Sequence, residues 1–262
     1  MIRTAATRRG FTLAELMISM AIMGMIVASL MALGDVAYVS SEYSLGRSHA
    51  SEQARIAVSR IERAVHEAYT TPSFPSAGVM STMVGSWRFP DTLIVWRPRV
   101  TPSTPDARPF NADGPPRMNE IVVFCPNPRD PSELLEITAA DDNTTELNVA
   151  TLATAVTALK KSQDADTVVL SNLVCTGTLS DVAGTPVRAR VRFEVVQRPT
   201  SYEIASTDWD DVAWVQGVAS AHFGLAQTWV RFELQLWSTD REDSREALPF
   251  FGSAAVYYEV EP

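Results

Sequence analysis

Cysteine and histidine, on which most metal sites and redox motifs depend, are scarce in this chain of 262 residues. The two cysteines, Cys125 and Cys175, are too few and too far apart for a four-ligand zinc site or a CxxC redox motif. The three histidines are scattered, and none belongs to an HExxH pattern. Phosphate-binding loops, dinucleotide-binding glycine patterns and nucleophile elbows are also missing. The sequence therefore predicts no catalysis, no cofactor and no metal site.

Positive charge is limited, with 22 lysines and arginines against 31 acidic residues and a net charge of −9. This balance argues against nonspecific binding to nucleic acid, because contacts to phosphate need a basic face. The composition is otherwise ordinary, at 46% hydrophobic and 20% charged residues. It excludes a chain that is disordered throughout and a transporter with many spans. The length suffices for a domain with a substantial core.

No basic residue occurs between Arg9 and Arg47, and most of this interval is apolar. Residues 16–33 read LMISMAIMGMIVASLMAL, an uncharged run of 18 residues. As a helix this run would extend roughly 27 Å, which is close to the thickness of the hydrocarbon core of a membrane. The early arginines precede the run, whereas Asp35 and Glu42 follow it. The positive-inside rule therefore predicts a cytoplasmic N-terminus and an external body.

A cleavable secretory signal is the simplest alternative for this segment, but the apolar run is longer than the usual h-region of about 7 to 15 residues, and no A-x-A site follows it. A plain signal anchor fits better, yet it leaves Glu15 unexplained. A carboxylate in a membrane helix costs on the order of 2.5 to 3.5 kcal/mol, so it usually has a function and a partner. In a simple anchor it could instead be a solvated first-turn acid, favoured by the helix dipole.

The residues in front of the run decide between these interpretations, because residues 8–15 read RRGFTLAE. This string resembles the N-terminal signal of type IV prepilins and of type II secretion pseudopilins. The resemblance implies that Arg8 and Arg9 belong to a basic leader. It also implies that prepilin peptidase cuts the bond between Gly10 and Phe11 and N-methylates the new terminus at Phe11.

The same resemblance implies a partner for Glu15. In a filament of staggered subunits, its carboxylate can meet the Phe11 ammonium of a neighbour, which would set the axial register. An unpaired charge in such an apolar setting would be costly. A pair with the Phe11 amine of the same subunit, four residues back along the helix, stays open as an alternative.

The sequence predicts four segments: a leader over residues 1–10, a transmembrane helix over 11–34, an amphipathic continuation over 35–71, and a β-rich head over 72–262. Apolar residues recur at three- and four-residue steps over residues 51–69, and no proline interrupts residues 11–71. We therefore expect one helix of about 59 residues, with a bend or fray between Gly34 and Gly46. Pro72 and Pro75 would end it.

Twelve of the 16 prolines fall between residues 72 and 131, which nearly excludes helix there. Apolar runs over residues 92–97 and 120–125 predict strands, separated by a long exposed loop over residues 98–116. Helical spacing over residues 144–161 predicts a second, shorter helix. Alternation of apolar and polar residues predicts further strands over 187–195 and 230–236, and we also expect strands over 214–223 and 254–260.

One long N-terminal helix packed on an antiparallel β-rich head is the pilin-like α+β plan. The size of the head and the late strand pattern are most similar to the J-type minor pseudopilin of type II secretion. The resemblance implies a structural subunit that is first anchored in the inner membrane. After assembly it would lie at the tip of a periplasmic pseudopilus. Its partners would be the I- and K-type minor pseudopilins, the major pseudopilin, prepilin peptidase and the inner-membrane assembly platform. Two alternatives stay open, namely a minor pilin of a type IV pilus or DNA-uptake system, and a signal-anchored periplasmic enzyme or binding protein.

Three further features allow two interpretations each. Cys125 and Cys175 would lie outside the cytoplasm and could form a disulfide, or they could be buried free thiols. Two acidic clusters could ligate Ca²⁺, but neither has the spacing of an EF-hand, so the preferred interpretation is that they are polar loops. The first cluster consists of Asp141, Asp142 and Asn143, and the second of Asp208, Asp210 and Asp211. The six tryptophans are expected mostly in the core or on a sheet face, with one or two available to a neighbouring subunit.

Overall fold

The computed structural model describes residues 12–70, 74–98, 115–178, 187–198, 200, 224–239 and 245–260. Contacts within the chain divide it into two compact units, residues 1–48 and residues 49–262. The expected strand over residues 214–223 and most of the expected loop over 98–116 lie outside the described residues.

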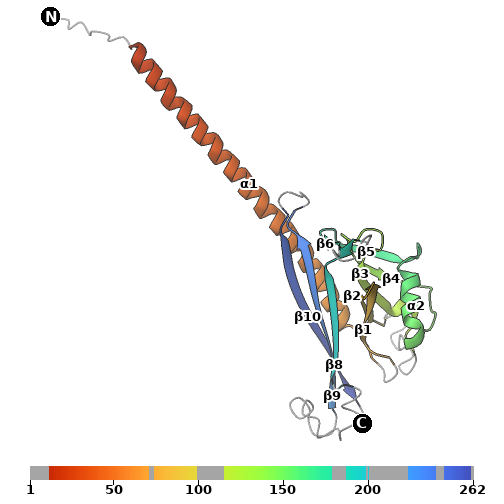
Figure 1. The fold of residues 1–262 in the computed structure, drawn as a ribbon. Helices are drawn as coiled ribbons and strands as arrows, with labels where there is room; N and C mark the ends of the chain where they lie inside the picture. Colours follow the sequence, from red (N-terminus) through yellow and green to blue (C-terminus); the bar gives the residue numbers. More distant parts are fainter. Residues whose placement is uncertain are drawn as a thin grey trace, which may run out of the picture. The chain divides into compact units, whose positions relative to one another are not determined.

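Helix α1 (Leu13–His66) has 54 residues and is helical at every position (Figure 1). The fray expected between Gly34 and Gly46 is therefore wrong. Glycine costs a helix only about 1 kcal/mol relative to alanine, which is too little to interrupt a long helix that contains no proline. The helix ends shortly before Pro72. Beyond its end the Tyr69 N–H donates to the Trp96 carbonyl oxygen at 2.9 Å, which joins the chain to a strand of the head.

A five-stranded antiparallel sheet has the order β1-β2-β3-β4-β5. Its strands are β1 (Ala77–Val84), β2 (Trp87–Trp96), β3 (Ile121–Pro126), β4 (Leu134–Thr138) and β5 (Asp166–Ser171). The strands expected over residues 92–97 and 120–125 are confirmed as parts of β2 and β3. They read as continuous apolar runs because both faces are covered. Leu93 faces one hydrophobic cluster, and its neighbour Ile94 faces the other.

A three-stranded antiparallel sheet has the order β10-β9-β8, and β6 (Thr176–Gly177) pairs with β7 (Arg188–Ala189) in a small ribbon. The three long strands β8 (Val191–Arg198), β9 (Gly224–Trp237) and β10 (Ala247–Val260) run side by side in Figure 1. The strands expected over residues 187–195 and 230–236 from alternation are confirmed in β8 and β9, and the strand expected over 254–260 is confirmed as the second half of β10. Phe193 and Phe232 are buried on one face, whereas Arg192 and Glu194 are exposed on the other.

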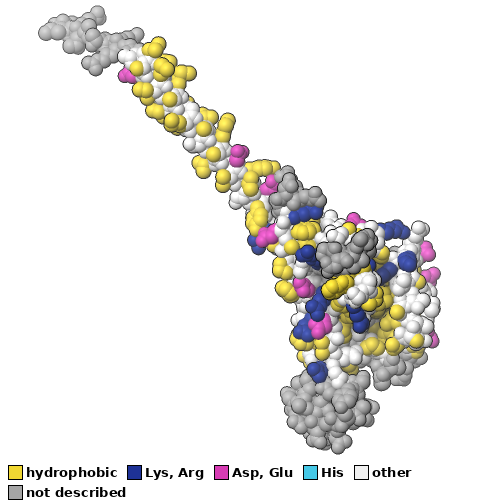
Figure 2. Space-filling model, viewed as in Figure 1, with side chains coloured by type: hydrophobic (Ala, Val, Ile, Leu, Met, Phe, Trp, Pro, Cys, Tyr) yellow, Lys and Arg dark blue, Asp and Glu magenta, His cyan; other side chains and the backbone are white. Residues whose placement is uncertain are grey.

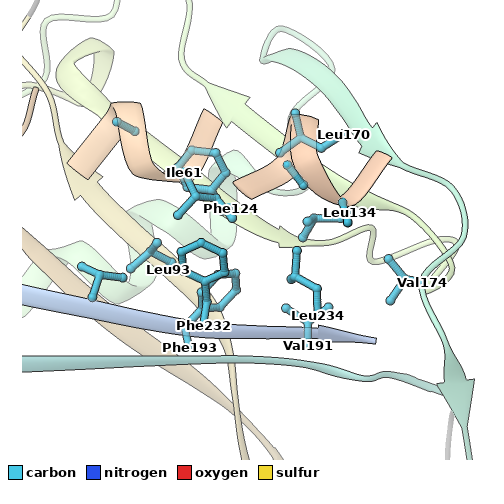
Figure 3. Close-up of a cluster of buried hydrophobic side chains, with 14 of the residues drawn as sticks. Ile61, Leu93, Phe124, Leu134, Leu170, Val174, Val191, Phe193, Phe232 and Leu234 are labelled. Atoms are coloured by element: carbon cyan, nitrogen blue, oxygen red, sulfur yellow. The ribbon is translucent and has the colours of Figure 1, made fainter. Parts of the chain in front are cut away.

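The main core lies where residues 50–65 of α1 meet both sheets. Figure 3 shows Ile61 of the helix beside Phe124 of β3, with Phe193 of β8 and Phe232 of β9 nearby. Four of the six buried helix residues are alanines, which let the helix approach the strands closely. They are Ala50, Ala54, Ala57 and Ala64. The expectation that the later half of the helix packs on a sheet is confirmed, and so is the pilin-like α+β plan.

Helix α2 (Val149–Leu159) covers the other face of the five-stranded sheet and confirms the second helix expected over residues 144–161. Asn148 caps it, since its side-chain oxygen accepts from the Thr151 N–H at 2.8 Å. Just after the helix, the Lys160 ammonium donates to the Thr92 hydroxyl, which connects the C-terminal end of α2 to β2. The small 3₁₀ helix η1 (Met118–Glu120) precedes β3.

Candidate functional site

The N-terminal end of α1 is the candidate site, and Thr12 and Glu15 are its described polar residues. Arg8, Arg9, Gly10 and Phe11 lie outside the described residues, so their predicted roles are not tested by the geometry. Thr12 stands immediately before the helix, and Glu15 is in its first turn. Both side chains are exposed.

Thr12 and Glu15 form a reciprocal capping box. The Thr12 N–H donates to Glu15 Oε2 at 2.9 Å, and the Glu15 N–H donates to Thr12 Oγ1 at 3.3 Å. The Thr12 hydroxyl also donates to Glu15 Oε2 at 3.0 Å. These bonds satisfy backbone donors that a helix start leaves without partners, which matters most where water is excluded.

Sequence reasoning assigned Glu15 but missed Thr12. The pattern T-x-x-E over residues 12–15 is the signature of a capping box and could have identified the pair. The box occupies one carboxylate oxygen, because both bonds end on Oε2. Among the described residues none donates to Oε1. The carboxylate therefore keeps capacity for a second donor such as an ammonium group.

The surface of the helix over residues 16–33 is almost entirely apolar. α1 contains an 18-residue window with a mean hydropathy of 2.3 and no buried residue, so it is long and apolar enough to cross a membrane. Figure 2 shows hydrophobic side chains along this part of the helix. Exposed apolar residues include Met17, Met20, Ile22, Met25 and Met31. A surface of this kind is unfavourable in water and suits lipid or the helices of neighbouring subunits.

The polar groups inside the apolar stretch are internally satisfied. The Ser19 hydroxyl donates to the Glu15 carbonyl oxygen at 2.7 Å, and the Ser29 hydroxyl donates to the Met25 carbonyl oxygen at 2.8 Å. Bonds to the preceding turn let a hydroxyl enter an apolar medium without an unpaired donor. The two serines are therefore compatible with a membrane-embedded helix.

Residues 6–31 match the family model described as the prokaryotic N-terminal methylation motif. The chain carries this methylation motif. The fold is pilin-like, and the motif supports a type IV pilin-like protein: it implies a substrate of prepilin peptidase and the membrane-anchoring helix typical of prepilins. Proteins of this kind are generally structural subunits without enzymatic activity. No curated protein and no solved structure gave a match to the chain.

The cysteines of the pilin-like head are both buried and free. The alternative of a disulfide between Cys125 and Cys175 is therefore not what the structure contains. Cys125 belongs to the cluster under α2, whereas the Cys175 N–H donates to the Gln235 carbonyl oxygen in β9 at 2.7 Å. Burial raises the pKa of each thiol to about 11, so neither resembles a reactive nucleophile.

The remaining candidate sites hold structural or surface residues. Asp141 and Asp142 lie in a turn, and the Asp141 carbonyl oxygen accepts a hydrogen bond from the side-chain amide of Asn119. Asp208, Asp210 and Asp211 lie outside the described residues. In the part of the chain that the structure describes, no three His, Cys, Asp or Glu side chains gather as metal ligands. Among the tryptophans, Trp96 is buried, while Trp87 and Trp229 are exposed.

Proposed function

We propose that this chain is a minor pseudopilin, a non-enzymatic subunit of the type II secretion pseudopilus that prepilin peptidase matures. One observation carries the proposal: a capping box of Thr12 and Glu15 opens a helix whose next turns expose apolar side chains in all directions. Such a helix suits both storage in a membrane and side-by-side packing in a filament. Cleavage between Gly10 and Phe11 would place a new ammonium group close to the start of this box.

The unused Oε1 of Glu15 supports a role in filament register. The carboxylate can keep its bonds to Thr12 and still accept from a methylated Phe11 ammonium, either of a neighbouring subunit or of its own chain. In both cases the pair would be buried once the helices pack together. A missing partner would then leave an uncompensated charge in an apolar setting.

We place the subunit at the filament tip, as a J-type pseudopilin, because its head of about 190 residues is hard to repeat around a tightly packed helical core. In this proposal residues 1–10 are the leader, 11–34 cross the inner membrane, 35–71 continue the helix, and 72–262 form the periplasmic head. The I- and K-type minor pseudopilins, the major pseudopilin and the assembly platform would be its partners. The exposed Trp229 and Trp87 are candidate contacts.

N-terminal mass analysis of the membrane protein tests maturation directly. After coexpression with prepilin peptidase, the wild type should begin at an N-methylated Phe11, whereas Gly10→Val should retain residues 1–10. Gly24→Ala is the matched control, because a Cβ at Gly24 meets nothing within 4 Å and the position lies beyond the cleavage motif. A wild-type chain that keeps its first ten residues would contradict the proposal.

Co-purification separates the secretion role from its nearest alternative. Crosslinking in cells that contain both systems should recover I- and K-type pseudopilins with the mature chain. Recovery of the minor pilins of a type IV pilus or DNA-uptake system instead would assign the chain to that machine. A head that works fully when residues 1–48 are removed, with the rest of α1 kept in its core, would favour an anchored periplasmic binding protein or enzyme.

A further inference from the structure

A groove of about 780 Å³ opens in the head where strands of the two sheets approach each other. It is lined by residues of β1, β2 and β9, and by every residue from Arg188 to Val195. Because consecutive residues of a strand point to alternate faces, a run of eight lining residues means that the groove follows the edge of the strand. Figure 2 shows Lys and Arg side chains on the face of the head where β8 lies.

The groove is basic, although the chain as a whole carries a net charge of −9. Its lining includes four arginines, Arg88, Arg188, Arg190 and Arg192, and two glutamates, Glu194 and Glu233. Glu194 has a cationic partner, whereas Glu233 has a neutral one. Glu194 pairs with Arg231 at 3.0 Å, and Glu233 accepts from Gln235 Nε2 at 2.8 Å. Glu194 is therefore neutralised by Arg231, whereas Glu233 keeps its charge, and the four arginines leave the groove positive overall.

The arginines have few partners of their own. Arg88 Nε donates to the Ser81 hydroxyl at 3.0 Å, and Arg190 Nη1 donates to Gln235 Oε1 at 3.3 Å. Arg188 Nε is buried without a hydrogen-bond partner. Within the described part of the chain, none of the four forms an ion pair. A buried donor without an acceptor is costly, and a guanidinium group without a carboxylate can still bind one through two parallel bonds.

Three of the arginines repeat at a spacing that an extended chain can match. Arg188, Arg190 and Arg192 alternate along β7 and the start of β8, and all three line the groove. Arg190, between the two strands, is also hydrogen-bonded like a strand residue. Its N–H donates to the Cys175 carbonyl oxygen, and its carbonyl oxygen accepts from the Gln235 N–H. Side chains two residues apart on a strand repeat every 6.4 to 6.8 Å or so. Carboxylates at alternate residues of an extended peptide have the same repeat.

The same edge offers backbone hydrogen bonds. In the described residues β8 pairs with β9 alone, and β1 pairs with β2 alone, so each strand has one edge without a strand partner. An extended segment can add to such an edge, with main-chain bonds giving affinity and alternate side chains giving specificity.

We propose that this groove binds an acidic segment of a partner protein in extended conformation, as a strand added beside β8. Carboxylates at alternate positions of the segment pair with Arg188, Arg190 and Arg192. Arg88, from the opposite wall, contributes a fourth positive charge. The proposal concerns the head alone, so it holds whether or not the chain is cleaved at Gly10.

Fluorescence anisotropy with the full-length chain in detergent micelles tests the proposal. The probe is a labelled octapeptide in which glutamate alternates with threonine, and two comparison peptides have the same glutamates in one block or lysine in place of glutamate. The alternating peptide should bind at least several-fold more tightly than the block peptide, and the lysine peptide should not bind. R188Q/R190Q/R192Q should weaken binding about tenfold, as expected for three partly exposed ion pairs.

The matched control is R47Q/R55Q/R63Q, which removes three arginines from α1 and should change binding less than twofold. Equal losses in the two triple variants would overturn the proposal, and so would equal binding of alternating and block peptides. Tight binding of heparin to the same site in place of the peptide would show a general anion site and overturn it as well.

Hydrogen exchange keeps the proposal testable if the triple variant does not fold. Bound peptide should slow hydrogen exchange of the β8 amides in the wild type, because an added strand forms hydrogen bonds with the β8 backbone. Ion pairs between side chains alone would not protect these amides. The single variant Arg192→Gln, at an exposed position, should weaken this protection several-fold. Unchanged exchange in β8 at saturating peptide would contradict strand addition.

Discussion

The ring of Phe232 occupies the space that a side chain at Gly252 would need. The two residues are directly opposite each other on β9 and β10, and a Cβ at Gly252 would lie 2.2 Å from Phe232 Cζ. Phe232 is buried against Phe193 of β8, so its ring has little room to move. The glycine is therefore required by close packing across the sheet.

Gly252→Ala should destabilise the head by about 1 to 3 kcal/mol, the usual cost of inserting a methyl group into a packed core. Chemical denaturation of the full-length chain, followed by tryptophan fluorescence, measures the change. Gly78→Ala is the matched control in β1, since a Cβ there meets nothing within 4 Å. Equal midpoints for the two variants would show that the Phe232 ring is free to shift.

Substitutions of Glu15 should separate its capping role from its charge. Glutamine can replace glutamate in a capping box, whereas leucine cannot. If a charged pair sets filament register, Glu15→Gln and Glu15→Leu should both insert into the membrane and both fail to assemble. Pseudopilus assembly and membrane fractionation provide the two readouts. Normal assembly of the glutamine variant would mean that the cap alone is needed.

Thr12→Ala tests the cap from the other side. It removes one bond to the Glu15 N–H and one to the Glu15 carboxylate, which should cost the start of the helix about 1 kcal/mol. We expect more rapid hydrogen exchange in the first turn of α1 and unchanged insertion. Thr12→Ser, which keeps the hydroxyl, serves as the control and should exchange like the wild type.

Arg60→Met should destabilise the head more than Arg63→Met. Arg60 Nε lies 3.0 Å from Glu136 Oε2, whose side chain is 9% exposed, so loss of the arginine leaves a mostly buried carboxylate without its counter-charge. Glu136 Oε2 accepts no well-aligned hydrogen bond, so its contact with Arg60 is mainly electrostatic. Arg63 pairs with Glu67 on the helix surface, where such pairs contribute less than about 1 kcal/mol. Similar losses of unfolding free energy in the two variants would contradict a larger contribution from the Arg60–Glu136 pair.

Stability of the head should fall as the pH rises from about 9 to about 11. Burial raises the pKa of Cys125 and Cys175 from 9.0 to about 11, so the folded state holds the thiol protons more tightly than the unfolded state does. The contribution is fully present below pH 9 and is lost as the pH rises through 11. Denaturation midpoints across this range measure the effect, and C125A/C175A should show a weaker pH dependence. In the native wild type, alkylation at pH 8 should be slow.

Much of the fold could be predicted from local patterns. The strands β8 and β9 alternate apolar and polar residues over much of their length, and the apolar run of α1 is unmistakable. The strands β1, β4 and β5 were not predicted. They lack a regular alternation, since β4 is buried on both faces and four of the six residues of β5 are exposed.

Local order in the sequence determined the apolar helix, the methylation motif and the capping box, because each depends on residues within a few positions of one another. Tertiary structure alone decided three other features: the separation of Cys125 from Cys175, the closeness of Phe232 to Gly252, and the position of three alternating arginines on the edge of a groove. These depend on which strands become neighbours. That choice is made by the burial of many distant side chains at once, and no short stretch of sequence contains it.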